Sequence, residues 1–227
     1  MPEPLKLFPW SSCKIMLSIP GLNAIIATFL CSLTALPATA QESPADQPHL
    51  ADMTEIRADD ARRLQELDAS AGAALRQAFA GGAPEDIAEL TKALAGAPLS
   101  PEDALAALPG EWSCRTIKLG KNLPLVVYQE FRCLVSENGE FEKLSGSQRS
   151  RGKLHLDGER LVYLGTGFVS GETPVPYADL PEQVDTQTTP QLMPEIGVVE
   201  MTAPDHARIL FPDPYLESRM DLILLRR

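Results

Sequence analysis

The apolar residues of this chain follow two different periods, and the change falls near Gly110. Before Gly110 they recur every three or four residues, which predicts amphipathic helices. We expect one helix that ends at Gly81-Gly82, a second over 84–95 and a third over 100–108, with Ser100 as its cap. Residues 53–109 are therefore interpreted as a helical arm packed on a larger domain. The apolar positions of the first helix are Leu64, Leu67, Ala71, Leu75 and Phe79.

From Gly110 onward apolar and polar residues alternate between turn signals such as Asn138-Gly139 and Asp157-Gly158. This alternation predicts strands joined mostly by hairpins. Eight consecutive strands favour an up-and-down antiparallel β-barrel or a strongly curved sheet, so the fold class is α+β with a barrel domain over 110–227. The strands are expected near 112–119, 125–136, 140–147, 149–156, 160–168, 196–203, 206–212 and 219–226.

One connection, over 169–195, is too long for a hairpin and is rich in proline. Loops of this length in compact domains are usually lids, binding loops or disordered segments. Two interpretations stay open: a disordered segment, or a lid over one mouth of the barrel.

Cys114 and Cys133 are expected to form a disulfide, and the alternative is two free thiols. They are equidistant from Leu123-Pro124, inside a turn signal, so a hairpin folded at that bond places them opposite each other. A loop of this length gives on the order of 3 kcal/mol of stabilisation. The remaining pairs would be Trp112 with Val135, Thr116 with Phe131 and, on the opposite face, Arg115 with Arg132.

The first forty residues resemble an export signal. Lys6 and Lys14 precede an apolar stretch over 22–33, and Ala38-Thr39-Ala40 forms a cleavage site. Cleavage there leaves a linker over 41–52 and removes Cys13 and Cys31, so the mature chain keeps one cysteine pair, as expected outside the cytoplasm. We predict a periplasmic or secreted protein without a stable membrane span; Met16 is an alternative start, and lipidation is disfavoured.

The mature chain is acidic, with 18 Lys and Arg against 30 Asp and Glu. Such a charge disfavours nucleic acid and anionic membranes as partners. Its three histidines lack a second imidazole or thiol at metal-ligand spacing, its serines lack a Gly-x-Ser-x-Gly elbow, and it has no phosphate loop. We therefore expect no catalytic residues, no metal and no cofactor.

Basic residues are concentrated between Gly110 and Arg160, a segment that contains nine Lys and Arg and seven Asp and Glu. Arginines converging there could bind a carboxylate or phosphate, because a guanidinium donates two parallel hydrogen bonds. The alternative is a solvated face paired with the acidic helices. Gln148 lies in a glycine-containing strand and would be either a ligand contact or a structural hydrogen-bonding node. The candidate ligand-binding residues are Arg115, Arg132, Gln148 and Arg149.

Two families resemble this chain. Gly110-Glu111-Trp112, with Arg219 or Arg226 near the last strand, resembles the lipocalin-like (calycin) barrels, and that resemblance implies an arginine packed on the Trp112 ring at the closed barrel end. The segments 112–118, 131–133 and 144–149, with Glu217-Ser218 and Asp221, resemble a family of exported bacterial proteins known as a domain of unknown function. The second resemblance implies export and the cysteine pair.

Periplasmic inhibitors of metalloproteases also combine a signal, one disulfide and an eight-stranded barrel opening with Gly-x-Trp. They act through a short extended arm, whereas residues 53–109 are long and helical. Our leading hypothesis is a non-enzymatic, exported barrel that binds a small amphipathic or anionic ligand, or an envelope protein. The alternative is a protein-interaction module such as a protease inhibitor. The sequence leaves open whether the barrel is hollow.

Overall fold

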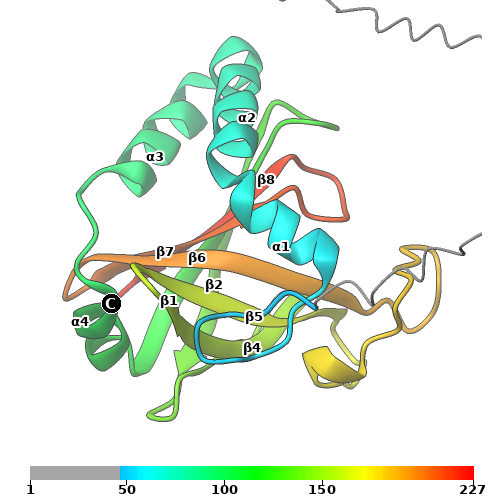
Figure 1. Ribbon diagram of the computed structural model, residues 1–227. Coiled ribbons are helices and arrows are strands. Elements are labelled where there is room, and N and C mark those ends of the chain that lie inside the picture. The colour runs from blue at the N-terminus through cyan, green and yellow to red at the C-terminus, as the bar shows by residue number, and fades with distance from the viewer. Residues whose placement is uncertain (1–46) are drawn as a thin grey trace, which may run out of the picture. The chain divides into compact units, whose positions relative to one another are not determined.

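A computed structural model describes residues 47–227 of the chain (Figure 1). The expected signal and the first half of the expected linker, residues 41–46, lie outside these residues. The helices are α1 (Ala58–Gln65), α2 (Leu67–Gly81), α3 (Pro84–Leu94) and α4 (Pro101–Ala107), with a short 3-10 helix, η1 (Tyr177–Asp179). The strands are β1 (Gly110–Leu119), β2 (Leu125–Val135), β3 (Glu140–Lys143), β4 (Gln148–Asp157), β5 (Arg160–Val169), β6 (Met193–Ala203), β7 (His206–Pro212) and β8 (Met220–Arg226).

The eight strands form a closed antiparallel barrel in chain order, as the sequence pattern predicts. β3 is the exception in length, because the chain leaves the sheet after Lys143 and turns at Gly146, which has a φ of 92°. As a result, β2 pairs with β3 only over its last residues, Cys133 to Val135. A gap in the strand pairing therefore opens between β2 and β4 at one end of the barrel.

The expected first helix is divided into α1 and α2 at Glu66. The division lets the two helices cover different strands: Leu64 of α1 packs with the outward residues of β5 and β6, whereas Ala74 and Ala78 of α2 pack on β1, β7 and β8. The cap of α4 is as predicted, since Ser100 Oγ accepts a hydrogen bond from the Asp103 amide at 3.1 Å. Figure 1 shows α2 and α3 over one side of the barrel and α4 beside the C-terminus.

The disulfide between Cys114 and Cys133 is present, but the predicted register of its hairpin is wrong by two residues. Cys114 lies opposite Phe131 and Trp112 opposite Cys133, so the two cysteines are diagonal neighbours with Cα atoms 5.9 Å apart. Two effects partly cancel: the turn is centred earlier in the chain, which alone would shift the register by three residues, and a bulge between Arg115 and Ile117 takes back one of them. A slip of two residues preserves the faces, and both cysteines therefore remain inside the barrel.

The register also corrects the outer face of this hairpin. Arg115 lies opposite Glu130, and Arg132 lies opposite Ser113. Two like charges are thus not directly opposed, and Arg115 donates to Glu130 at 3.2 Å and to Glu89 of α3 at 3.3 Å.

Side chains fill the barrel at the end where β1 begins. Phe141, Tyr163 and Phe211 stack edge to face, with ring centroids 5.5 and 5.6 Å apart, and Leu108 packs with this cluster from the loop after α4. Trp112 closes the same end and donates from Nε1 to the Leu108 carbonyl at 2.8 Å. This half of the barrel is therefore solid.

The arginine on the Trp112 ring is Arg227, with its guanidinium carbon 4.0 Å from the ring centroid, rather than Arg219 or Arg226. Side chains alternate along β8, so Leu225 points inward and Arg226 points outward, where it lies 3.8 Å from Glu89. Arg219 precedes β8 and lies at the opposite end of the barrel.

The long connection between β5 and β6 is anchored where it follows β5. Thr166 Oγ1 donates to the Val175 carbonyl at 2.8 Å, and the hydroxyl of Tyr177 donates to Asp60 of α1. Its last residues, from Gln191, line the open end of the barrel.

Candidate functional site at the barrel mouth

The barrel is open at the end opposite Trp112, where β1, β3, β5 and β7 end and the even-numbered strands begin. A cavity of about 80 Å³ lies in this mouth. Its floor is apolar and includes Phe211 and Ile223, whereas its wall is charged. The charged residues of the wall are Arg63, Lys118, Lys143, Arg149, Glu195 and Asp221.

Glu195 reaches across the barrel because β5 has glycine where a side chain would block it. A Cβ atom at Gly167 would lie 2.5 Å from Glu195 Oε1. The carboxyl passes over β5 to hydrogen-bond with Ser150 of β4, whose hydroxyl is also 2.7 Å from the Tyr163 hydroxyl. Burial raises the pKa of Glu195 to about 7, and the charge of Asp221 adds to the rise, while Ser150 and the cations Arg63 and Lys118 oppose it.

Asp221 and Lys118 occupy the adjoining strands β8 and β1. Burial raises the pKa of Asp221 to about 6, although Lys118 and a hydrogen bond from Ser218 oppose this. Lys118 donates to Glu217 at 2.6 Å and to Gln148 at 2.8 Å. Burial alone would lower the pKa of Lys118, but Asp221 and Glu217 outweigh it and raise the pKa. The positive charge of Lys118 is thus balanced by the carboxylates Glu217 and Asp221 of the protein itself.

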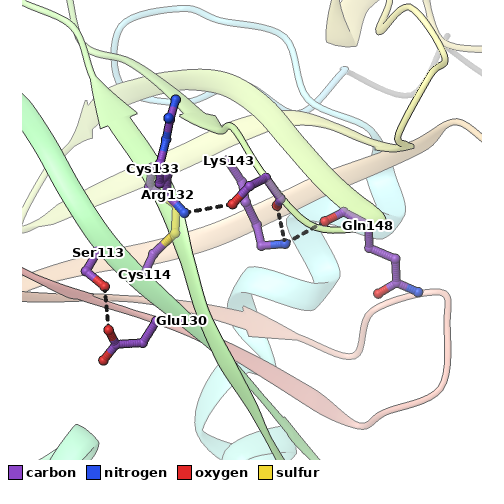
Figure 2. The surroundings of a disulfide bond; sticks show 8 residues. Ser113, Cys114, Glu130, Arg132, Cys133, Lys143 and Gln148 are labelled. Atoms are coloured by element: carbon purple, nitrogen blue, oxygen red, sulfur yellow. Dashed lines mark hydrogen bonds between the residues drawn. A yellow bond between two sulfur atoms is a disulfide. The ribbon is translucent and has the colours of Figure 1, made fainter.

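Lys143 closes the gap between β2 and β4. Its Nζ donates to the carbonyl oxygens of Ser145 and Gln148 at 3.1 and 2.6 Å (Figure 2). It also lies 3.9 Å from the centroid of the Phe131 ring. No carboxylate lies within 4 Å of it among residues 47–227. Burial lowers the pKa of Lys143 to about 8, against an opposing effect of Glu195.

Arg63 enters the mouth from α1, outside the barrel sequence. Only 4 % of this residue is exposed, and its Nη2 donates to Asp60 and to the Pro194 carbonyl. The ring of Tyr215, from the loop between β7 and β8, packs on the guanidinium at 4.8 Å. Its Nε is buried and has no hydrogen-bond partner in the described part of the chain. Arg63 therefore brings an unused donor to the wall of the cavity.

The structure separates the four candidate ligand-binding residues into two pairs. Gln148 and Arg149 line the cavity, where Arg149 Nε donates to the Gly146 carbonyl at 3.3 Å. Arg115 and Arg132 lie on the outer face of the barrel, and in Figure 2 the side chain of Arg132 points away from Lys143 and Gln148. The four residues do not converge.

Sequence reasoning placed Lys118 and Lys143 in the basic half of the domain but missed the main partners of the site. Arg63 lies in the predicted helical arm, outside the barrel sequence in which the ligand-binding residues are expected. Glu195 fell within the long connection, because the extension of β6 back to Met193 is hidden by Pro194. Period-two alternation from the buried Val199 and Gly197 back to Glu195 is the signal that could have placed its side chain inside.

Two further properties follow from the described residues. Between residues 47 and 227, no three His, Cys, Asp or Glu side chains are grouped so that they could hold a metal ion. None of the helices in that part of the chain is long and apolar enough to cross a membrane.

Residues 53–225, which are most of the chain, match the family described as "Domain of unknown function (DUF4893)". No curated protein and no solved structure matches the chain.

Proposed function

The chain belongs to the DUF4893 family, and we propose that it is an exported, non-enzymatic barrel protein that binds a small molecule through an anionic group at the barrel mouth. The observation that supports this most strongly is Arg63, a nearly fully buried arginine that lines the cavity with an unpartnered Nε. Arg149 adds a second guanidinium, with no carboxylate within 4 Å in the described part of the chain. Two such groups favour a carboxylate or phosphate.

The size of the cavity restricts the ligand. A cavity volume on the order of 10–15 Å³, measured in the same way, holds one water molecule. The cavity of about 80 Å³ therefore admits a molecule of roughly five to eight non-hydrogen atoms. The apolar end of the barrel is filled by side chains, which leaves no room for an acyl chain. Of the two ligand classes that the sequence favours, the small anionic ligand therefore fits better than the amphipathic one.

Ser150 is the serine nearest to an enzymatic arrangement. Its hydroxyl is held between Tyr163 and Glu195, and the residue is buried. A nucleophile needs access to its substrate, so this arrangement favours a structural role for Ser150.

Export rests on the predicted signal over residues 1–40, and the internal disulfide is compatible with it. The alternative of a protease inhibitor needs a free arm before Gly110. The helices α1 to α4 bury Leu64, Leu90 and Leu108 against the barrel, which favours a role in its stability.

The binding proposal is tested by titration calorimetry with acetate, propionate and inorganic phosphate in a low-chloride buffer. We expect at least one of these anions to bind, and Arg149→Gln to weaken it by tenfold or more, because one guanidinium of the mouth is lost. The matched control is Arg132→Gln on the outer face, for which we expect less than a twofold change. Absence of binding at millimolar concentration, or equal weakening in both variants, would contradict the proposal.

A further inference from the structure

The charges at the barrel mouth are balanced. The cavity wall contains four basic residues and two carboxyls, and two further carboxylates outside it neutralise wall residues: Asp60 contacts Arg63, and Glu217 contacts Lys118. When all of them are ionised, the cluster carries no net charge. A ligand with an excess of negative charge finds no excess of positive charge here, whereas a ligand with one charge of each sign is matched.

The two wall carboxyls each keep an oxygen without a strong donor. Glu195 bonds to Ser150 through Oε2, and no hydrogen bond to its Oε1 is formed within the described residues. Asp221 bonds to Ser218 through Oδ1, while its Oδ2 lies 3.9 Å from Lys118 Nζ, beyond hydrogen-bond distance. Both carboxyls line one cavity, Glu195 from β6 and Asp221 from β8, so an ammonium group placed there could donate a hydrogen bond to each of them.

From this arrangement we infer that the ligand is a zwitterion, a free amino acid with a short side chain, whose carboxylate lies at Arg63 and Arg149 and whose ammonium group lies at Glu195 and Asp221. The inference rests on the proposed function and names its ligand class. A small amino acid such as alanine fits the roughly five to eight non-hydrogen atoms that the cavity admits. The apolar floor of Phe211 and Ile223 accepts a short aliphatic side chain.

An ammonium group between these carboxyls has a measurable consequence for protons. Burial, chiefly, raises the pKa values of Glu195 and Asp221 to about 7 and about 6, with a smaller rise from the charge of Asp221 on Glu195 and of Glu217 on Asp221. A bound cation favours their ionised forms and lowers both values. Near pH 6.5, binding of the zwitterion should therefore release protons, and binding of a simple carboxylate, which favours the protonated forms, should take them up.

The test compares alanine with its two halves by calorimetry near pH 6.5, in two buffers that differ in ionisation enthalpy. Propionate lacks the ammonium group and ethylamine lacks the carboxylate. We expect alanine to bind at least tenfold more tightly than either, with net proton release. In Glu195→Gln, a near-isosteric change, the preference for alanine over propionate should fall below twofold. In Glu130→Gln, an outer-face carboxylate that pairs with Arg115, it should persist.

Each other outcome is decisive. If propionate binds as tightly as alanine, the zwitterion assignment is wrong and the anion site stands. If ethylamine binds as tightly as alanine, the carboxylate contributes nothing and both proposals fail. If the peptide Ala-Ala binds more tightly than alanine, the ligand is not a free amino acid. If no compound binds, the mouth is not a site for small ions of either kind.

Discussion

A carboxyl inside a barrel is costly when it is ionised, and among residues 47–227 only Ser150 donates a hydrogen bond to Glu195. Its pKa of about 7, against the ordinary value of 4.5, means that the folded protein holds this proton over a range where the unfolded chain has released it. The folded state binds more protons than the unfolded state in that range, so stability falls as the pH rises through it.

Between pH 4.5 and 7, the free energy of unfolding of the native chain should fall relative to that of Glu195→Gln, by up to about 3 kcal/mol, and level off above pH 7. Urea unfolding across that range measures it. Glu130→Gln, which removes a carboxylate on the outer face, serves as the control for the loss of one negative charge. A difference that is flat or that grows with pH for Glu195→Gln would show that this carboxyl is not desolvated.

At the scale of elements, β5 provides the space that the mouth requires. Tyr163 and Glu195 both place polar groups over this strand, and its two glycines, Gly165 and Gly167, keep the interior face open there. A Cβ atom at Gly165 would lie 2.2 Å from the Tyr163 hydroxyl and 2.5 Å from the Arg151 carbonyl oxygen. The second contact is with the backbone of β4, which cannot move without disturbing the barrel.

We therefore expect Gly165→Ala to destabilise the protein by about 1–3 kcal/mol, as overpacking of a core does. Gly72→Ala, in the interior of α2, is the matched control, because its new methyl group would meet only a side-chain nitrogen at 3.8 Å. That control should stabilise the protein by roughly 0.5–1 kcal/mol. Chemical denaturation measures both. Equal effects of the two substitutions would refute the role assigned to β5.

The strands were predictable from the sequence, whereas their fine register was not. Alternation from Trp112 onward reports which face is buried, and it identified all eight strands and the inward cysteines. The bulge between Arg115 and Ile117 adds one residue to β2, so its odd-numbered side chains point outward at Leu125 and Val127 but inward at Phe131 and Cys133, and simple alternation does not predict such a switch. The site was even harder to predict from the sequence. Arg63 and Glu195 lie on segments far apart in the chain, and only the packing of α1 on β6 brings them to one cavity.

At the scale of the whole molecule, the barrel is apolar on both of its faces over much of its circumference. Outward residues such as Ile117 and Leu222 of β1 and β8 are buried by α2 and α3, and Ile196 of β6 is buried beneath α1. The helical segment is therefore needed to cover the sheet, in addition to supplying Arg63.

This arrangement predicts that a chain beginning at Gly110 will aggregate or bind a hydrophobic dye, because it exposes those outward faces to water. A chain beginning at Gln41 should remain soluble and unfold in a single cooperative transition. Size-exclusion chromatography and dye fluorescence distinguish the two. If the shorter chain is soluble, binds no dye and unfolds cooperatively, the barrel folds without the helices. The helices would then be a separable arm, as the protease-inhibitor hypothesis requires.

The position of the disulfide has a consequence for the order in which the protein matures. Cys114 and Cys133 belong to the first two strands, whereas the barrel closes only when β8 returns to pair with β1. In a chain that emerges N-terminus first into an oxidising compartment, both thiols arrive before the closing strand. An isolated two-stranded hairpin is marginally stable, so a covalent bond formed at that moment would hold its register while the other six strands are still arriving. Oxidation would then come before folding is complete. Its timing would decide whether β1 is already held in register when β8 arrives to pair with it.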